Sequence, residues 1–514
     1  MSQINVTNLT FSYEGSFDTI FDKVSLVIDT DWKLGLIGRN GKGKTTFLNL
    51  LLGKYDYLGT ITAPKRFAYF PYPLTKEERE KSAADIVEDA LVYESWRVIC
   101  ELDKLKMEAK KLYQPFCTLS QGEQTKVMLA MLFSREEDFY LLDEPTNHLD
   151  LASREILKSY LKTKKGFILI SHDRDLLDAC IDHVLALNRT SIEITKGNFS
   201  TWWENKEKKD TFMQAENEKH LHEISKLKKA AKQASDWAKK GESRKIGFDP
   251  IKENDRSIAT RSYIGAKTKK MQSKRKQIEH RIGQEIQQKE GLLQDIEATK
   301  MLKMMPLTHH KEVFIRAKKY GFTYLGETMN HEVLKDFNIE LRQGERLLLK
   351  GQNGCGKSTF LKSVLSHCDK SDDVLTKKVE SGELTIASGL LVSYVSQDTS
   401  FLKGTIYEWL EMEEGEPTLI MTLLHQLGFE RKQFEKRMEE FSEGQKKKVL
   451  LAKSLMTRAH LYIWDEPFNY VDLFARMQIE QLLLTYQPTM LLVEHDPVFG
   501  DSVATKIISM NNDK

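Results

Sequence analysis

The sequence predicts an α/β fold in two tandem copies, joined by a long antiparallel α-helical hairpin. A glycine-rich motif occurs twice, as GRNGKGKTTF from Gly38 and GQNGCGKSTF from Gly351. Each copy follows a short apolar strand and leads into a helical pattern. Between the copies the composition shifts toward Lys, Glu, Gln and Ala, with few glycines and prolines. We therefore expect a first domain at 1–203, a hairpin linker at 204–311 with a tip loop near 244–262, and a second domain at 312–514.

The size and composition of the chain fit a cytoplasmic protein. With 514 residues it is too long for a single core. Its five cysteines are scattered, which argues against a disulfide framework and against a zinc or iron–sulfur site. The N-terminus lacks the pattern of a secretory signal, and no apolar run reaches the roughly 18 residues that a membrane span needs. We expect no membrane contact.

The two glycine-rich motifs match GxxxxGK[ST] and predict phosphate-binding loops. Glycines let backbone N–H groups close around phosphate oxygens, and the following helix adds its positive dipole end. Lys44 and Lys357 would reach the β- and γ-phosphates of a nucleotide, while Thr45 and Ser358 would ligate Mg²⁺.

A second pair of motifs places carboxylates at the ends of apolar strands. These motifs are FYLLDEP at 139–145 and LYIWDEP at 461–467. Open α/β sheets bind ligands at the carboxyl edge of the strands, so the adjacent acids would face a nucleotide there. Asp143 and Asp465 would serve the magnesium ion, and Glu144 and Glu466 would polarise the attacking water.

Two further pairs of motifs occur in the same order in both copies. LSQGEQTKV begins at Leu119 and FSEGQKKKV at Phe441, and each serine precedes the strand-end aspartate by 23 residues. Ser and Gly at the start of a helix suit donors that face an anion. LISHD with His172 and LVEHD with His495 end later apolar strands.

In this order and number, the motifs resemble the ATP-binding cassette (ABC) family over residues 1–203 and 312–514. The resemblance implies ATP hydrolysis with Mg²⁺, and a monomer whose two cassettes form a head-to-tail sandwich with ATP at the interface. Site 1 would combine Lys44, Thr45, Asp143, Glu144 and His172 with Ser442 and Gly444. Site 2 would combine Lys357, Ser358, Asp465, Glu466 and His495 with Ser120 and Gly122.

The resemblance also implies roles for residues around these two sites. Both glutamates and both histidines would be catalytic, Gln397 would join the magnesium ligands, and Tyr13 and Tyr324 would stack on adenine. The other expected nucleotide contacts lie in the glycine-rich loops: Gly38, Asn40, Gly41, Gly43 and Thr46, and Gly351, Asn353, Gly354, Gly356 and Thr359.

The two copies depart from each other at positions that matter for chemistry. Gln397 in the second copy corresponds to Tyr72 in the first. His172 follows Ser171, whereas His495 follows Glu494. We therefore hypothesise that the two sites hydrolyse ATP at different rates.

The segment between the copies predicts a basic helical hairpin. Apolar residues step by three or four before the loop, and a similar stripe follows it. From Lys226 to Arg281 there are 18 Lys and Arg against 6 Asp and Glu, a net of +12 in a chain of net +2. This asymmetry is typical of an element that binds a polyanion, although a solvated coiled-coil linker is the alternative. The two stripes are Leu221, Ile224, Leu227, Ala231, Ala234 and Ala238, then Met271, Ile278, Ile282, Ile286, Leu293 and Ile296.

A long hairpin between two complete cassettes resembles the ABC-F family, whose members bind the ribosomal E site and aim this linker at the peptidyl-transferase region. DEPFNYVD at 465–472 is similar to a variant in the antibiotic-resistance branch. The resemblance implies the 70S ribosome as partner, through 23S rRNA and P-site tRNA, and protection against lincosamides, pleuromutilins and group A streptogramins. The expected RNA-contacting tip residues are Arg244, Lys245, Phe248, Lys252, Arg256 and Arg261, and turn packing is an equal alternative for Phe248.

Two other functions remain open at this point. One is a housekeeping ABC-F translation factor that acts on stalled ribosomes. The other is a transport ATPase that works with separate membrane subunits.

Overall fold

The chain divides into two compact units, formed by residues 1–200 with 299–514 and by residues 201–298. Within the first unit we refer to residues up to 200 as the first half and to residues from 303 as the second half. The computed structural model describes residues 2–13, 19–90, 95–135, 138–147, 149–187, 192–246, 273, 277, 280–282, 303–324, 331–351, 354–369, 378–412, 417–429 and 433–510.

The first half alternates strands and helices. Its strands are β1 (Gln3–Ser12), β2 (Thr19–Asp29), β3 (Lys33–Ile37), β4 (Leu58–Thr62), β5 (Phe67–Phe70), β6 (Phe139–Asp143), β7 (Phe167–Ile170), β8 (His183–Leu187) and β9 (Ile192–Lys196). Its helices are α1 (Lys44–Leu51), α2 (Lys76–Glu80), α3 (Ala83–Ala90), α4 (Ser95–Lys104), α5 (Gln121–Phe133), α6 (Leu151–Lys162) and α7 (Arg174–Cys180), with short 3₁₀ helices η1 (Ala109–Tyr113) and η2 (Phe116–Thr118).

The second half repeats this order. Its strands are β10 (Val313–Tyr324), β11 (His331–Arg342), β12 (Arg346–Lys350), β13 (Lys378–Ile386), β14 (Val392–Val395), β15 (Leu461–Asp465), β16 (Met490–Val493) and β17 (Lys506–Ser509). Its helices are α10 (Lys357–Asp369), α11 (Ile406–Met412), α12 (Pro417–Gln426), α13 (Glu443–Met456), α14 (Leu473–Tyr486) and α15 (Pro497–Val503), with the 3₁₀ helix η4 (Met438–Glu440).

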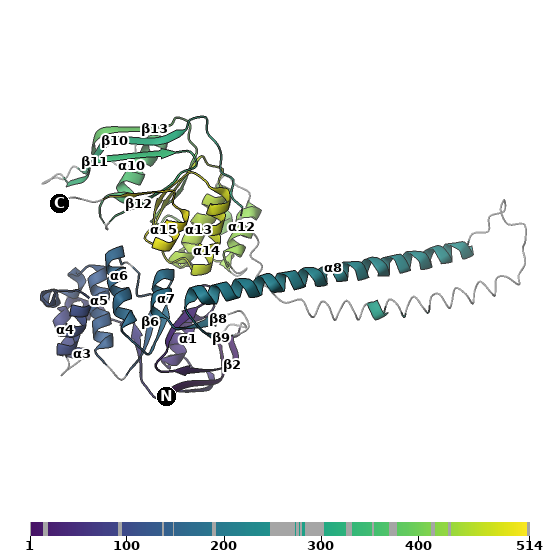
Figure 1. The fold of residues 1–514 in the computed structure, drawn as a ribbon, viewed down its shortest axis with the longest axis horizontal. Helices are drawn as coiled ribbons and strands as arrows, with labels where there is room; N and C mark the ends of the chain where they lie inside the picture. Colours follow the sequence, from purple (N-terminus) through teal and green to yellow (C-terminus); the bar gives the residue numbers. More distant parts are fainter. Residues whose placement is uncertain are drawn as a thin grey trace, which may run out of the picture. The chain divides into compact units, whose positions relative to one another are not determined.

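Corresponding sheets have the same strand order in the two halves. The antiparallel sheets are β2-β1-β4 and β11-β10-β13, and the larger sheets are β5-β6-β7-β3-β8-β9 and β14-β15-β16-β12-β17. Within the larger sheets the pairs are parallel, except that β9 runs antiparallel to β8. Figure 1 shows α3, α4 and α5 gathered at one end of the first half, away from β2. The predicted tandem α/β fold is confirmed.

The apolar runs of the sequence form the centre of each larger sheet. All residues of β7 and β16 are buried, as are four of the five in β6 and all five in β15. Strands covered on both faces read as continuous apolar runs, because neither face meets water. The parallel strands therefore end together at one edge, where the predicted carboxylates and histidines follow them.

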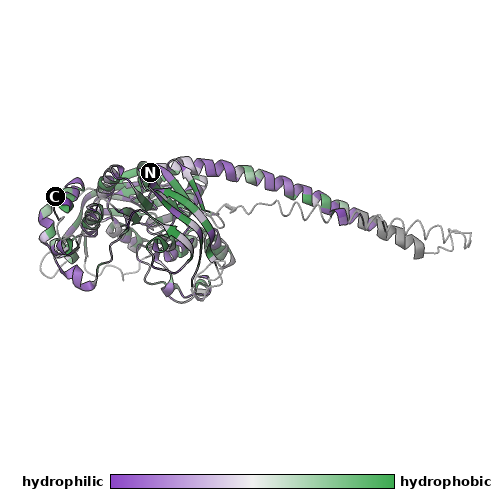
Figure 2. Ribbon diagram, turned by 90° about the horizontal axis from the view of Figure 1, so that it is seen from below, coloured by the Kyte–Doolittle hydropathy of each residue, from purple (hydrophilic) through white to green (hydrophobic). Residues whose placement is uncertain are grey.

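Helix α8 (Phe199–Ile246) forms the first and longest described part of the linker. Figure 2 shows it coloured mainly as hydrophilic, in contrast to the hydrophobic strands of the sheets. The helix ends at Ile246, at the start of the region near 244–262 where the sequence predicts the tip loop. The rest of the tip, with Phe248, Lys252, Arg256 and Arg261, lies outside the described residues.

Candidate nucleotide sites

The two glycine-rich loops join a central strand to a helix, as predicted. They connect β3 to α1 and β12 to α10, and Gly43 and Gly356 have φ values of 88° and 96°. A Cβ on Gly43 would lie 2.7 Å from Ile20 Cγ2, and one on Gly356 would lie 2.8 Å from Val333 Cγ1. Only glycine fits both the backbone angle and the space. A side chain at either position would clash with a residue of β2 or β11.

The predicted phosphate-binding lysines lie over these loops. Lys44 Nζ donates to Gly38 O at 2.7 Å and to Asn40 Oδ1 at 3.2 Å. Lys357 Nζ donates to Gly351 O at 2.9 Å. Burial lowers the pKa of Lys44, although the nearby acids, first of them Asp472, oppose the shift. Asn353 lies outside the described residues.

The predicted magnesium ligands come together at the carboxyl edge of each sheet. Thr45 Oγ1 and Tyr69 OH both donate to Asp143 Oδ2 at 3.1 Å. In the second half, Asp465 Oδ1 is buried without a hydrogen-bond partner among the described residues. Burial disfavours the ionised form of both aspartates and so raises their pKa above the ordinary value. A divalent cation bound here would stabilise the ionised form. The donor set of hydroxyls and carboxylates fits Mg²⁺.

Each predicted catalytic glutamate pairs with its predicted histidine. Glu144 N donates to Ile170 O and Glu466 N to Val493 O, both at 2.9 Å, so the glutamates are tied to the ends of β7 and β16. The histidines follow these strand ends by two residues, and each Nε2 lies 3.2 Å from a glutamate Oε1. Both glutamates occupy the left-handed region, with φ of 51° and 48°. Such backbone strain in non-glycine residues is found mainly at functional sites.

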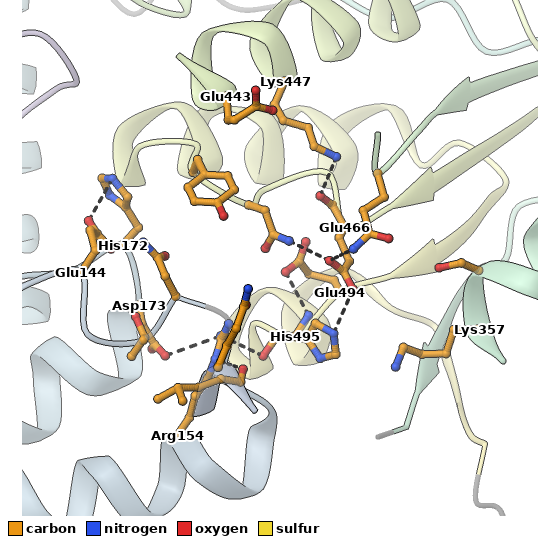
Figure 3. Close-up of a pocket in the computed structure, with 18 of the residues that line it drawn as sticks. Glu144, Arg154, His172, Asp173, Lys357, Glu443, Lys447, Glu466, Glu494 and His495 are labelled. Atoms are coloured by element: carbon orange, nitrogen blue, oxygen red, sulfur yellow. Dashed lines mark hydrogen bonds and ion pairs between the residues drawn. The ribbon is translucent and has the colours of Figure 1, made fainter. Parts of the chain in front are cut away.

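The two glutamates have unequal surroundings. Glu466 Oε2 also accepts hydrogen bonds from Gln397 Nε2 at 2.9 Å and from Asn469 Nδ2 at 2.7 Å (Figure 3). Burial favours the protonated form of Glu466, but the bonds from His495 and Asn469 outweigh it and lower its pKa. Burial and the neighbouring Asp143 raise the pKa of Glu144 to about 8. The surroundings of the two glutamates therefore shift their pKa values in opposite directions.

The predicted signature serines begin helices in both halves. Ser120 caps α5 and Ser442 caps α13, each accepting from the backbone N–H three residues on, in a capping box with Glu123 or Gln445. Each serine hydroxyl thus accepts a hydrogen bond from a main-chain N–H at the start of its own helix. A Cβ on Gly444 would lie 2.2 Å from Tyr470 O, whereas one on Gly122 would find Leu149 Cδ2 at 3.4 Å.

Residues of the two halves meet at both sites. At site 1, Asn40 Nδ2 donates to Tyr470 O at 3.3 Å, which joins the first glycine-rich loop to the loop after Glu466. At site 2, a cavity of about 710 Å³ is lined by Lys357, Ser358, Thr359 and Glu466 together with Gln121 of the first half. The cavity also reaches Glu144 and His172. Ser120 and Gly122 do not line it, and their neighbour Gln121 does.

Of the two tyrosines predicted to stack on adenine, the structure describes the side chain of Tyr13. Tyr13 is 42% exposed, and its hydroxyl lies 2.8 Å from Thr46 Oγ1 of the first glycine-rich loop. Its ring packs edge-on against Phe11 and Tyr55. Tyr324 ends β10, and the position of its side chain is outside the described part of the chain.

Several residues at the sites were not found from the sequence. Asn469 binds Glu466, and Lys447 Nζ donates to Ser396 O at 2.8 Å and Glu466 O at 3.2 Å while remaining buried. Asn147 and Asn469 each follow their glutamate by three residues, so the repeat itself carried this signal. The repeat gave no such signal for Lys447, because the equivalent residue of the first half is Thr125.

Comparison with known proteins identifies the family. The family model described as ABC transporter matches residues 21–147 and 334–469, which is half of the chain. The ribosome protection protein VmlR of Bacillus subtilis is 27% identical over 99% of this chain and 87% of its own length. ABC transporter F family member 5 of Arabidopsis thaliana is 23% identical over 99% of this chain and 78% of its own length. These relatives confirm the predicted resemblance to the ABC-F family.

Solved structures share the fold. A structure of the archaeal ribosome recycling factor with a ribosomal stalk protein covers 98% of this chain and 87% of that chain, with a TM-score of 0.59 and 18% identity. The RNase-L inhibitor covers 98% of this chain and 87% of that chain, with a TM-score of 0.58 and 17% identity. Among the described helices of the present chain, none has the length and apolar character needed to cross a membrane. The duplicated domains and their motifs place the chain in the ABC transporter family, as an ATPase with two ATP-binding domains.

Proposed function

We propose that this protein is a ribosome-binding ATPase that occupies the E site and protects the peptidyl-transferase centre from antibiotics. One observation carries the proposal. The relative named as a ribosome protection protein aligns with 99% of this chain and 87% of its own length, so the match extends over the linker as well as the two halves. The drugs proposed are lincosamides, pleuromutilins and group A streptogramins.

In this proposal the two sites hydrolyse ATP by positioning and electrostatics. Lys44 and Lys357 would hold the β- and γ-phosphates, and Mg²⁺ would be held by Thr45 and Asp143 at site 1 and by Ser358, Asp465 and Gln397 at site 2. The ion would neutralise charge that develops on the phosphate oxygens. Glu144 and Glu466 orient the attacking water, and each accepts a proton as the water attacks. His172 and His495 hold the glutamates in place through the contacts of 3.2 Å.

The unequal glutamates support the hypothesis of unequal hydrolysis. Glu466 is already an ionised base near neutral pH, because hydrogen bonds from His495 and Asn469 lower its pKa. Glu144, with a pKa of about 8, must first lose a proton. Site 2 is therefore the faster site in the proposal, and site 1 is the slower one.

The linker supplies the contact with RNA in this proposal. Between Lys226 and Ile246, α8 carries eight Lys and Arg against two Asp and Glu. A helix of this charge is attracted to the phosphate backbone, and the attraction weakens as salt concentration rises. The tip would then act near the P-site tRNA and the drug-binding region of 23S rRNA.

Co-sedimentation with 70S ribosomes tests the proposal. The Glu144→Gln, Glu466→Gln double variant should pellet with ribosomes when ATP and Mg²⁺ are present, and remain in the supernatant without nucleotide. Release by increasing salt would agree with an electrostatic contact. A double variant that never binds ribosomes but associates with membranes would favour a transport ATPase instead.

A housekeeping translation factor is the second candidate. It is favoured by relatives whose names mention no resistance, such as the ATP-binding protein Uup of Buchnera aphidicola, 27% identical over 98% of this chain. Drug susceptibility in a host without its own resistance separates the two. The intact protein should raise the inhibitory concentration, and deletion of residues 244–258 should abolish the effect. A host that stays sensitive with the intact protein would favour the housekeeping role.

A further inference from the structure

Two arginines occupy equivalent positions in the two halves. Arg154 and Arg476 each follow the predicted catalytic glutamate of their own half by ten residues. They lie in the first turn of α6 and α14, the helices that begin directly after the loops of Glu144 and Glu466. Each therefore has a fixed place relative to the glutamate loop of its own half.

Arg476 of the second half reaches the histidine loop of the first half. Its Nε donates to Val471 O at 2.9 Å and its Nη2 to Phe468 O at 2.6 Å, so the loop before α14 holds the guanidinium from two sides. Its Nη1 then donates to His172 O at 3.1 Å across the two halves. Arg476 is only 9% exposed, so water competes little for these bonds.

Arg154 of the first half makes the reciprocal contact. Its Nε donates to Leu149 O at 3.1 Å, and its Nη1 donates to His495 O at 3.4 Å in the second half. Figure 3 shows Arg154 between Asp173 and His495, with contacts to both. Among the described residues, the two arginines thus form a crossed pair between the two histidine loops.

Each guanidinium also lies near the aspartate that follows the histidine of its own half. Arg154 Nη1 is 3.8 Å from Asp173 Oδ2, and Arg476 Nη1 is 3.7 Å from Asp496 Oδ2. Asp173 and Asp496 are the N-caps of α7 and α15, so they are fixed to those helices. Each arginine side chain therefore bridges the two histidine loops. It pairs with the aspartate carboxylate in the histidine loop of its own half and donates to the histidine carbonyl of the other half.

We propose that Arg154 and Arg476 are crossed positioning residues that make each His–Glu pair depend on closure of the two halves. Arg476 holds the main chain of His172 and so serves site 1, and Arg154 holds the main chain of His495 and so serves site 2. The planar guanidinium suits this task, because it has several donors in a rigid arrangement. Neither arginine is proposed to touch ATP. The inference rests on the proposed roles of the glutamates and histidines, and it is independent of ribosome binding.

Single-site backgrounds separate the two crossed contacts. Glu466→Gln leaves site 1 as the working site, and Glu144→Gln leaves site 2. In the Glu466→Gln protein, Arg476→Ala should lower kcat about tenfold with little change in KM, because the histidine is misaligned while ATP still binds. Arg154→Ala should lower kcat less there, because Arg154 reaches the His172 loop only through its ion pair of 3.8 Å with Asp173. In the Glu144→Gln protein, Arg154→Ala should cause the large loss of kcat and Arg476→Ala the small one.

Three further measurements distinguish positioning from a general structural role. Arg174→Ala is the matched control, because Arg174 pairs with Glu480 across the halves and, within the described parts of the chain, donates to neither histidine carbonyl. It should act equally in both backgrounds. Arg476→Lys and Arg154→Lys retain the charge and should restore only part of kcat, and they replace the alanine variants if those fail to fold. Circular dichroism verifies the fold of each variant.

The pattern of losses decides the inference. Equal losses in both backgrounds, or unchanged kcat in both, would overturn it. All measurements use intrinsic ATPase activity without ribosomes. Failure of the protein to bind ribosomes would therefore contradict the proposed function and leave this result intact.

Discussion

At the scale of single residues, Glu144 and Glu466 differ although both follow Asp in the same motif. The pKa of Glu144 rises to about 8 from an ordinary 4.5 because of burial and Asp143, while that of Glu466 is lowered. Folding therefore favours the protonated form of Glu144. Its contribution to stability decreases as pH rises from the ordinary value toward 8, and is constant above that.

This difference predicts opposite effects of two matched substitutions. Glu144→Gln should raise the Tm of the nucleotide-free protein, and the gain should be larger at about pH 8 than at about pH 6, because the neutral amide avoids the cost of ionisation. Glu466→Gln should lower the free energy of unfolding by on the order of 1 kcal/mol, since it disturbs hydrogen bonds to a charged acceptor. Thermal melts of both variants across this pH range provide the measurement. A pH-independent gain for Glu144→Gln would contradict the argument.

A buried lysine gives a second prediction at this scale. Lys447 is 2% exposed, and its ammonium group donates to main-chain carbonyls of Ser396 and Glu466. Lys447→Met should destabilise the protein by about 1–3 kcal/mol, because these carbonyls lose a charged donor. It should also lower turnover at site 2 in the Glu144→Gln background. Denaturant unfolding measures the first effect. Lys446→Met is the control, since the one ion pair of Lys446 within the described part of the chain is with the exposed Glu443, and the substitution should cost below about 0.5 kcal/mol.

The residues that sequence could predict are those whose chemistry needs only their neighbours along the chain. Lys44 and Gly43 belong to a loop whose shape is determined by adjacent glycines, so the motif alone located them. Lys447 could not be found in this way. Its place under the Glu466 loop depends on how α13 packs, and nothing in the run of three lysines shows that Lys447 and Lys448 are buried while Lys446 is not.

At the scale of elements, the starts of α5 and α13 share a capping box but differ in the space next to the glycine. A Cβ at position 444 would lie 2.2 Å from a main-chain oxygen of Tyr470, whereas at position 122 the nearest atom is a leucine methyl at 3.4 Å. Main chain yields less readily than a flexible side chain, so the same substitution has different costs.

Gly444→Ala and Gly122→Ala therefore form a matched pair. The first should destabilise the protein by about 1–3 kcal/mol and reduce ATPase activity at site 1, because Tyr470 also contacts Asn40 across the halves. The second should cost below about 1 kcal/mol, since helix propensity favours alanine over glycine. Differential scanning fluorimetry and single-site ATPase assays measure both. Comparable losses in the two variants would contradict the structural explanation.

The elements themselves were largely predictable, and their exact ends were not. Strands such as β6 and β15 read directly as apolar runs because both faces are covered. Arg244 and Lys245 are good helix formers and carry no signal that would end a helix, so the sequence locates the end of α8 only approximately.

At the scale of the whole molecule, both sites combine groups from the two halves, so ligand binding should stabilise the chain as one assembly. Asn40 contacts Tyr470, and Gln121 faces the cavity lined by Lys357. The Glu144→Gln, Glu466→Gln protein should gain about 2.7 kcal/mol for each of its two sites at an ATP concentration of about 100 Kd with Mg²⁺. Chelation of Mg²⁺ should remove most of this gain.

Melting curves with and without EDTA measure the effect. The Lys44→Ala, Lys357→Ala protein serves as the control, because it lacks the phosphate-binding ammonium groups and should show no shift. A nucleotide-induced rise in Tm that survives both EDTA and the lysine substitutions would contradict the assigned sites.

The tandem architecture was predictable because every motif occurs twice in the same order, and a repeat of this kind specifies two similar domains. The crossed contacts of Arg154 and Arg476 were not predictable from that repeat. Equal spacing places each arginine on its own helix, but its partner carbonyl lies more than 300 residues away along the chain. Only the packing of one half on the other brings the two together.

The left-handed backbone at Glu144 and Glu466, with φ of 51° and 48°, has a consequence for mutational scanning. Glycine adopts this conformation freely and asparagine tolerates it, whereas glutamate carries a cost of about 1–2 kcal/mol. A library selected for abundance or heat resistance should therefore enrich Gly and Asn at position 144, at the expense of the glutamate that the proposed hydrolysis at site 1 requires. At position 466 the hydrogen bonds that Glu466 accepts from Gln397 and Asn469 oppose this gain.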